Sequence, residues 1–91
     1  MAEELIGEVS HWFDRINVAG IKLSGDLVVG DRIHIIGHTT DLEQDVDSMQ
    51  LDNENVSEAG AGDEIGVKLT SRARPGDRVY KAIESTGQPG S

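Results

Sequence analysis

Apolar and polar residues alternate in several short segments of the chain, a pattern typical of half-buried β-strands. Ile33 and Ile35 fall on one face of their segment, and the residues between and around them, including Ile36, fall on the other. Ile65 and Val67 repeat this spacing. We therefore predict strands over residues 5–10, 18–23, 31–38, 45–51, 64–70 and 78–83, with a short additional strand around Val56.

Four Gly-Asp dipeptides stand immediately before apolar stretches, at residues 25–26, 30–31, 62–63 and 76–77. Glycine supplies the positive φ that many turns need, and aspartate can bond its own nearby backbone. Each pair therefore predicts a turn that leads into a strand. Because closing a sheet removes exposed edges, we expect an all-β fold: a six- to seven-stranded closed antiparallel β-barrel.

The length of 91 residues accommodates a single domain. We expect an N-terminal extension at residues 1–4, the barrel at 5–83 and a disordered C-terminal tail at 84–91. The longest apolar run covers only residues 27–29, which predicts no membrane segment and no signal peptide, and hence a cytoplasmic protein. The chain contains no cysteine, so disulfides, thiolate metal sites and cysteine nucleophiles are excluded.

Charge is strongly unbalanced along the chain. Seventeen acidic residues against eight basic ones give a net charge of −9, which disfavours binding to tRNA or rRNA over the whole surface. Nine acids and no Lys or Arg lie between Ile33 and Val67, whereas Arg72, Arg74 and Arg78 follow in the last third. Two interpretations remain open: this basic segment is an ordinary solvated face, or its three arginines form a docking surface for an acidic partner.

Motifs for catalysis are missing from the sequence. It has no glycine-rich loop ending in Gly-Lys-Ser or Gly-Lys-Thr, so we expect no GTP binding, and it has no Gly-x-Ser-x-Gly element. His34 and His38 share a strand face, but Ile36 separates them and local spacing supplies no acidic ligand for a metal. We predict no catalytic residue, no metal site and no cofactor, and therefore a chain that is not an enzyme.

Trp12 and Phe13 form the only aromatic pair in the sequence. Neighbouring side chains on a strand point to opposite faces. One ring is therefore expected in the core and the other outside it.

Several blocks taken together resemble the second, β-barrel domain of translation GTPases of the elongation factor Tu type. Their order in the chain matches the order in that family, from about Ile6 to Ile83. The chain looks like a freestanding elongation factor-like protein, and it is also similar to the barrel appended to collagenase-like peptidases. The blocks span residues 18–23, 27–37, 46–50, 59–67 and 74–80.

The resemblance implies a binding role, because the nucleotide-binding domain of these GTPases lies outside the matching region. The family position that meets the terminal adenosine of aminoacyl-tRNA falls on Gln50, where the family has a carboxylate. Acids around Gln50 would repel phosphates, and residues 12–16 replace glycines of the family's first turn. Gln50, Arg72, Arg74 and Arg78 are the candidate binding residues.

Two functions follow as expectations. The first is a non-enzymatic binding module that docks on a protein or ribonucleoprotein partner of the translation machinery. The alternative is an accessory subunit of a separately encoded enzyme such as a collagenase-like peptidase. The sequence leaves the partner and the oligomeric state open.

Overall fold

The computed structural model describes residues 2–83, so the predicted tail at 84–91 lies outside the described residues. The described residues form ten β-strands and no helix, and therefore contain no helix that spans a membrane. The strands are β1 (Ala2–Phe13), β2 (Val18–Leu23), β3 (Leu27–Val28), β4 (Arg32–Ile36), β5 (Asp41–Asp45), β6 (Met49–Leu51), β7 (Glu54–Val56), β8 (Glu58–Ala59), β9 (Glu64–Lys68) and β10 (Arg78–Ile83).

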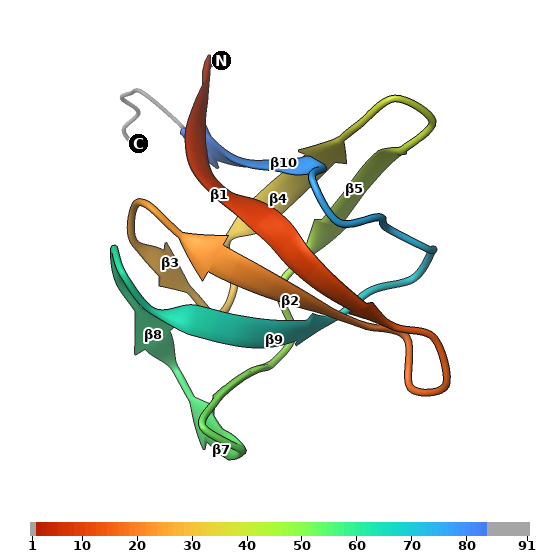
Figure 1. Ribbon diagram of the computed structural model, residues 1–91. Helices are drawn as coiled ribbons and strands as arrows, with labels where there is room; N and C mark the ends of the chain where they lie inside the picture. The colour runs from red at the N-terminus through yellow and green to blue at the C-terminus, as the bar shows by residue number, and fades with distance from the viewer. Residues whose placement is uncertain (1, 84–91) are drawn as a thin grey trace.

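Eight strands form one antiparallel sheet in the order β5-β4-β10-β1-β2-β9-β6-β7, and β3 pairs with β8 in a second, two-stranded sheet. The long strand β1 lies between β10 and β2 (Figure 1). The predicted all-β class is confirmed. The predicted closed barrel is not confirmed, because β5 and β7 stand at opposite ends of the sheet and are not paired with each other.

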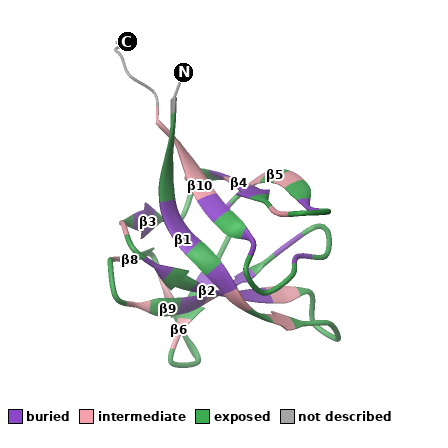
Figure 2. Ribbon diagram, turned by 45° about the horizontal axis from the view of Figure 1, so that its top comes forward, coloured by how far each residue is buried: buried purple, intermediate pink, exposed green. Residues whose placement is uncertain are grey.

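One hydrophobic core fills the interior, visible as the purple segments of the strands in Figure 2. The predicted strand faces are confirmed: Ile33, Ile35, Ile65 and Val67 are buried, whereas Ile36 is 38% exposed. Leu69 and Val79 also reach the core. The alternation in the sequence therefore identified the inward face of the two strands that carry Ile33, Ile35, Ile65 and Val67.

Strand β1 is longer than the predicted segment 5–10, and two irregularities interrupt its pairing. The register shifts between Leu5 and Gly7 and again between Val9 and His11. An extra residue in a strand reverses which side chains face inward beyond it. Ile6 and Val9, which are three positions apart, consequently both reach the core.

The aromatic pair lies at the far end of β1. Trp12 packs partly buried against the core and Phe13 is 46% exposed. One ring inside and one outside is the arrangement that the sequence predicted.

The predicted single strand over residues 45–51 is wrong, because β5 ends at Asp45 and β6 begins only at Met49. The backbone N–H of Val46 donates to the Asp31 carbonyl, and Gly30 N–H donates to the Val46 carbonyl, each at 2.8 Å. Residue 46 is thus held by the turn before β4. The chain then crosses to the other end of the sheet, where Met49 pairs with Val67 of β9.

Three of the four Gly-Asp pairs build the same turn. The φ angles of Gly30, Gly62 and Gly76 are 102°, 94° and 96°, in the range that glycine adopts most readily. In each turn the aspartate carboxylate accepts a backbone N–H from three residues earlier. These bonds join Val28 to Asp31 at 2.9 Å, Gly60 to Asp63 at 3.0 Å and Arg74 to Asp77 at 2.8 Å. They immediately precede β4, β9 and β10.

The turn at Asp77 also packs against the loop that contains Gly37 and bonds to strand β1. Asp77 is only 5% exposed, and its backbone carbonyl accepts the N–H of Val9 at 2.8 Å. A Cβ atom placed on Gly37 would lie 1.8 Å from Oδ1 of Asp77, far inside any allowed contact. The buried carboxylate therefore occupies the space where any other residue at position 37 would carry its side chain.

This contact gives a test of the packing. We expect Gly37→Ala to lower the free energy of unfolding by about 1 to 3 kcal/mol, since the new methyl group must displace a buried carboxylate. In an Asp77→Ala background the methyl group has room, so the cost of Gly37→Ala should fall close to zero. Urea unfolding of the four proteins in this cycle measures the coupling. Equal costs in both backgrounds would contradict the packing described.

Candidate functional site

A row of residues in register crosses five strands on the outer face of the sheet. His11 of β1 pairs with Gly20 of β2, Gly20 with Gly66 of β9, Gly66 with Gln50 of β6, and Gln50 with Asn55 of β7. Residues paired in this way point to the same face of a sheet. Because the two central positions are glycines, the middle of the row carries no side chain, and a groove of about 490 Å³ lies there.

The groove has one aromatic wall and one polar wall. The rings of His11 and Phe13 stack with centroids 5.2 Å apart and an interplanar angle of 25°. Opposite them, the Gln50 amide donates to Oδ1 of Asn55 at 3.3 Å. Besides His11, Phe13 and Gln50, the groove is lined by Ile16, Val18, Gly20, Asp52, Asn53, Glu64, Ile65 and Gly66.

Both glycines are needed for this shape. A Cβ on Gly20 would lie 3.2 Å from Cβ of His11, so the bare backbone allows the histidine to lie close to β2. A Cβ on Gly66 would lie 3.2 Å from Cγ1 of Val18 and would stand on the groove floor. A second hollow of about 260 Å³ shares Ile16 and Gln50 and includes Lys68.

The charge of the groove is acidic. Asp52 and Glu64 line it, and among the described residues no Lys or Arg does. Asp52 and Asn53 have φ angles of 53° and 66°, as a tight two-residue hairpin turn between β6 and β7 requires. Glu64 accepts a hydrogen bond of 2.5 Å from the hydroxyl of Ser10. The two carboxylates are thus positioned by local backbone geometry and by a neighbouring strand.

The structure places Gln50 in this groove but puts the three arginines elsewhere. Arg78 lies on β10 in register with Glu8 of β1, which is followed across the sheet by Lys22 and Glu64. Charges of alternating sign therefore neighbour one another along this row, an arrangement that stabilises a sheet modestly. Arg78 thus belongs to a charge row of the sheet.

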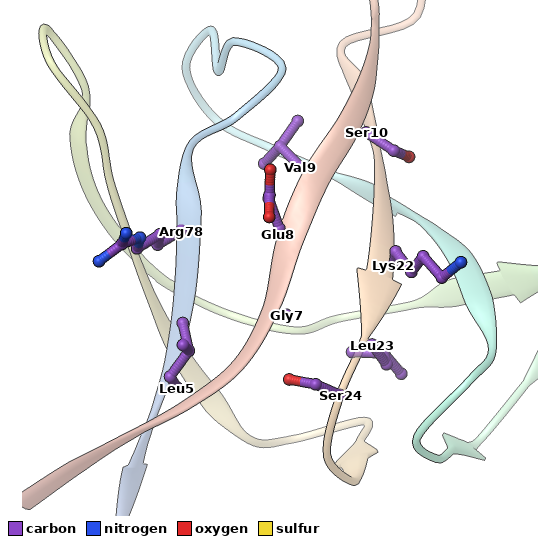
Figure 3. Close-up of a pocket in the computed structure, with 9 residues that line it drawn as sticks. All are labelled: Leu5, Gly7, Glu8, Val9, Ser10, Lys22, Leu23, Ser24 and Arg78. Atoms are coloured by element: carbon purple, nitrogen blue, oxygen red, sulfur yellow. The ribbon is translucent and has the colours of Figure 1, made fainter.

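Arg78 also lines a separate groove of about 420 Å³, together with Leu5, Gly7, Glu8 and Leu23 among others. In Figure 3 its side chain extends from β10 away from β1. Arg72 donates to Asp14 at 3.1 Å. The backbone N–H of Arg74 donates to the carboxylate of Asp77 in the turn before β10. Docking by these arginines remains a prediction.

A second polar cluster, which the sequence did not predict, surrounds His34. Its Nδ1 atom lies 2.9 Å from Glu3 and 3.8 Å from Glu43, and its Nε2 atom lies 2.6 Å from Asp41. Glu3 is 31 residues away in the chain and comes close only because β10 lies between β1 and β4. Long-range placement of this kind leaves no local spacing signal in the sequence.

Within residues 2–83 one group of side chains has the spacing of metal ligands. The ligand atoms of Glu3, His34 and Glu43 lie within 4.8 Å of one another, close enough to hold a metal ion. The imidazole of His34 already contacts two carboxylates, because one ring nitrogen faces Asp41 and the other faces Glu3. The hydrogen bond to Asp41, and then the bond and charge of Glu3, raise the pKa of His34 above 6.5 despite partial burial. When His34 carries its proton, both ring nitrogens therefore have a carboxylate partner.

A raised pKa in the folded state makes this cluster a pH-dependent contribution to stability. The contribution should be complete below about pH 6.5, the ordinary histidine value, and disappear as the pH rises through the higher folded pKa. We expect Asp41→Asn to lower the pKa of His34 in an NMR titration. The mutation should also cost more stability near about pH 5.5 than near about pH 9. The same cost at both pH values would show that the cluster does not bind a proton on folding.

Comparisons with known proteins identify what the chain resembles. It is 46% identical over 81 residues to an uncharacterized protease of Methanocaldococcus jannaschii, a match to 88% of this chain and 20% of that protein. It is 32% identical over 78 residues to a collagenase of Porphyromonas gingivalis, covering 84% of this chain and 22% of that protein. The chain thus spans about a fifth of the length of these relatives. No protein-family model matches the chain.

Solved structures with the same fold come from the C-terminal domain of a Geobacillus thermoleovorans protein assigned as a U32 peptidase. The crystal structure of that domain superposes with a TM-score of 0.82, covering 88% of this chain and 93% of the domain at 14% identity. Its selenomethionine variant gives 0.81, covering 86% and 99% at 15% identity. At such low identity this likeness establishes the fold alone.

These findings correct the assignment to the elongation factor Tu type. The relatives and the structural neighbours are collagenase and U32 peptidase proteins, so the description as a translation or elongation factor is wrong. The sequence blocks that suggested an elongation factor are explained largely by turn geometry and strand burial. Three of them contain a Gly-Asp turn followed by an alternating strand, which turn geometry and burial favour whatever the function.

Proposed function

We propose that this chain is a non-enzymatic accessory module of a collagenase-like peptidase and that it acts by binding a polypeptide. The supporting observation is the coverage of the matches: 88% of this chain aligns with only 20% of an archaeal protease at 46% identity. The likeness to a separately crystallised C-terminal peptidase domain fits a unit that folds apart from a catalytic domain.

The chemistry of the described residues supports a role without catalysis. A peptidase needs an activated nucleophile, a metal-bound water or a paired-carboxylate acid and base. The sequence has no cysteine, and within residues 2–83 the hydroxyl of Ser10 bonds a carboxylate, with no serine bonded to a histidine. The acids Asp52 and Glu64 are exposed and line an open groove, as expected for a binding surface.

A protein is the partner that the surface favours. The net charge of −9 repels nucleic acid phosphates, and the acids around the Gln50 groove strengthen this effect locally. Phe13 and Ile16 expose 46% and 58% of their surface at one end of the groove. Exposed apolar side chains next to polar ones are typical of protein-binding surfaces.

The test uses the catalytic region of a collagenase-like peptidase from the same cell, prepared without its own domain of this type. We expect this chain alone to leave gelatin peptides uncleaved. Added to the catalytic region, it should bind with a Kd on the order of micromolar in calorimetry. It should also lower the KM for gelatin peptides, since an added binding surface retains substrate near the active site.

An unrelated acidic protein of similar size serves as the control and should change neither quantity. Cleavage by this chain alone would overturn the non-enzymatic assignment. A catalytic region that neither binds the chain nor changes its KM would overturn the accessory role.

A further inference from the structure

We propose that the groove over Gly20 and Gly66 binds an arginine side chain carried by an extended segment of the partner. The guanidinium would lie on the stacked rings of His11 and Phe13 and pair with the acids at the groove. The inference rests on the proposed function in one respect only, namely that the partner is a polypeptide. No other property of a peptidase enters the argument.

Charge selects a cation for this groove. Asp52 and Glu64 both line it and no described Lys or Arg does, while Lys22 of β2 pairs with Glu64 across the strands just outside it. The Ser10 hydroxyl donates to Oε2 of Glu64, and among the described residues no hydrogen bond engages the other carboxylate oxygen. An arriving cation therefore meets two carboxylates, one of which is already held in place.

The rings select a flat cation. His11 and Phe13 stack with centroids 5.2 Å apart and an angle of 25°, so a flat group can continue the stack on an outer ring face. A guanidinium group is planar, weakly hydrated and stacks on aromatic faces, whereas the ammonium of lysine is a compact and strongly hydrated charge. This surface therefore favours arginine over lysine.

The glycine floor and the apolar rim accommodate the rest of the segment. With no side chain at Gly20 or Gly66, a ligand can approach the backbone of β2 and β9 closely. Ile16, which is 58% exposed, offers apolar surface for the methylene groups of an arginine. The volume of about 490 Å³ falls in the range of sites for small ligands and short peptide segments.

Short acetylated and amidated peptides of the form Gly-Leu-X-Leu-Gly serve as probes, with X as arginine, lysine, citrulline or glutamate. Citrulline keeps the shape of arginine but removes its charge. Titration into the ¹⁵N-labelled chain should shift the amide signals of Gly20 and Gly66 with the arginine peptide and leave them unchanged with citrulline or glutamate. We expect the arginine peptide to bind at least about threefold more tightly than the lysine peptide.

Three variants test the named contacts. Phe13→Leu, which keeps an apolar side chain, should weaken arginine binding about two- to fivefold by removing one ring. Glu64→Gln, which keeps an acceptor for Ser10, should weaken it about three- to fivefold. Gly66→Ala should block the floor and abolish the shifts. Glu8→Gln is the matched control, because Glu8 lies in the same row of charges as Glu64 but outside this groove.

The proposal is overturned if no peptide binds, or if lysine and arginine bind equally and Phe13→Leu has no effect, since charge alone would then explain binding. Signals of Gly20 and Gly66 that shift with protein concentration alone would show that a second copy of the chain occupies the groove. Should the catalytic region bind while the arginine peptide does not, the groove assignment fails and the accessory role stands. If the arginine peptide binds and the catalytic region does not, the groove assignment is supported and the accessory role is overturned.

Discussion

The hydrogen bond between an aspartate carboxylate and the backbone N–H three residues before it is the interaction on which much of this fold depends. It occurs at Asp31, Asp63 and Asp77, each time after a glycine with positive φ. Each bond fixes the residue at which a strand begins. Since a shift of one residue would turn every core side chain outward, a fixed start determines which face of the strand is buried.

The outer face follows from the same constraint. Once β9 begins at Glu64, Ile65 and Val67 must enter the core, and Gly66 must face outward opposite Gly20. The irregularity between Val9 and His11 then brings His11 into line with Gly20. The groove is therefore a direct result of strand register. Gly20 and Gly66 lie side by side only because β2 and β9 pair in the register that also buries the core side chains.

The sequence predicted the all-β class, the inward faces of β4 and β9 and the turns before β4, β9 and β10, because these depend on neighbouring residues. It did not predict the break after Asp45, because the bonds that hold Val46 come from residues 30 and 31. It named Gln50 as a binding residue through a resemblance that proved misleading. It could not supply the opposite wall, since His11 meets the same groove only through pairing across β2, β9 and β6. Likewise Glu3 and His34 meet only in the folded chain.

We propose that this chain binds a peptidase chain through the outer face of its sheet. It is tested most directly by adding the unlabelled catalytic region to the ¹⁵N-labelled chain and mapping which amide signals change. We expect the largest changes at Gly20, Gly66 and Gln50, with little change near Arg78. Changes confined to the segment from Arg72 to Arg78 would contradict it and would assign docking to the basic residues instead.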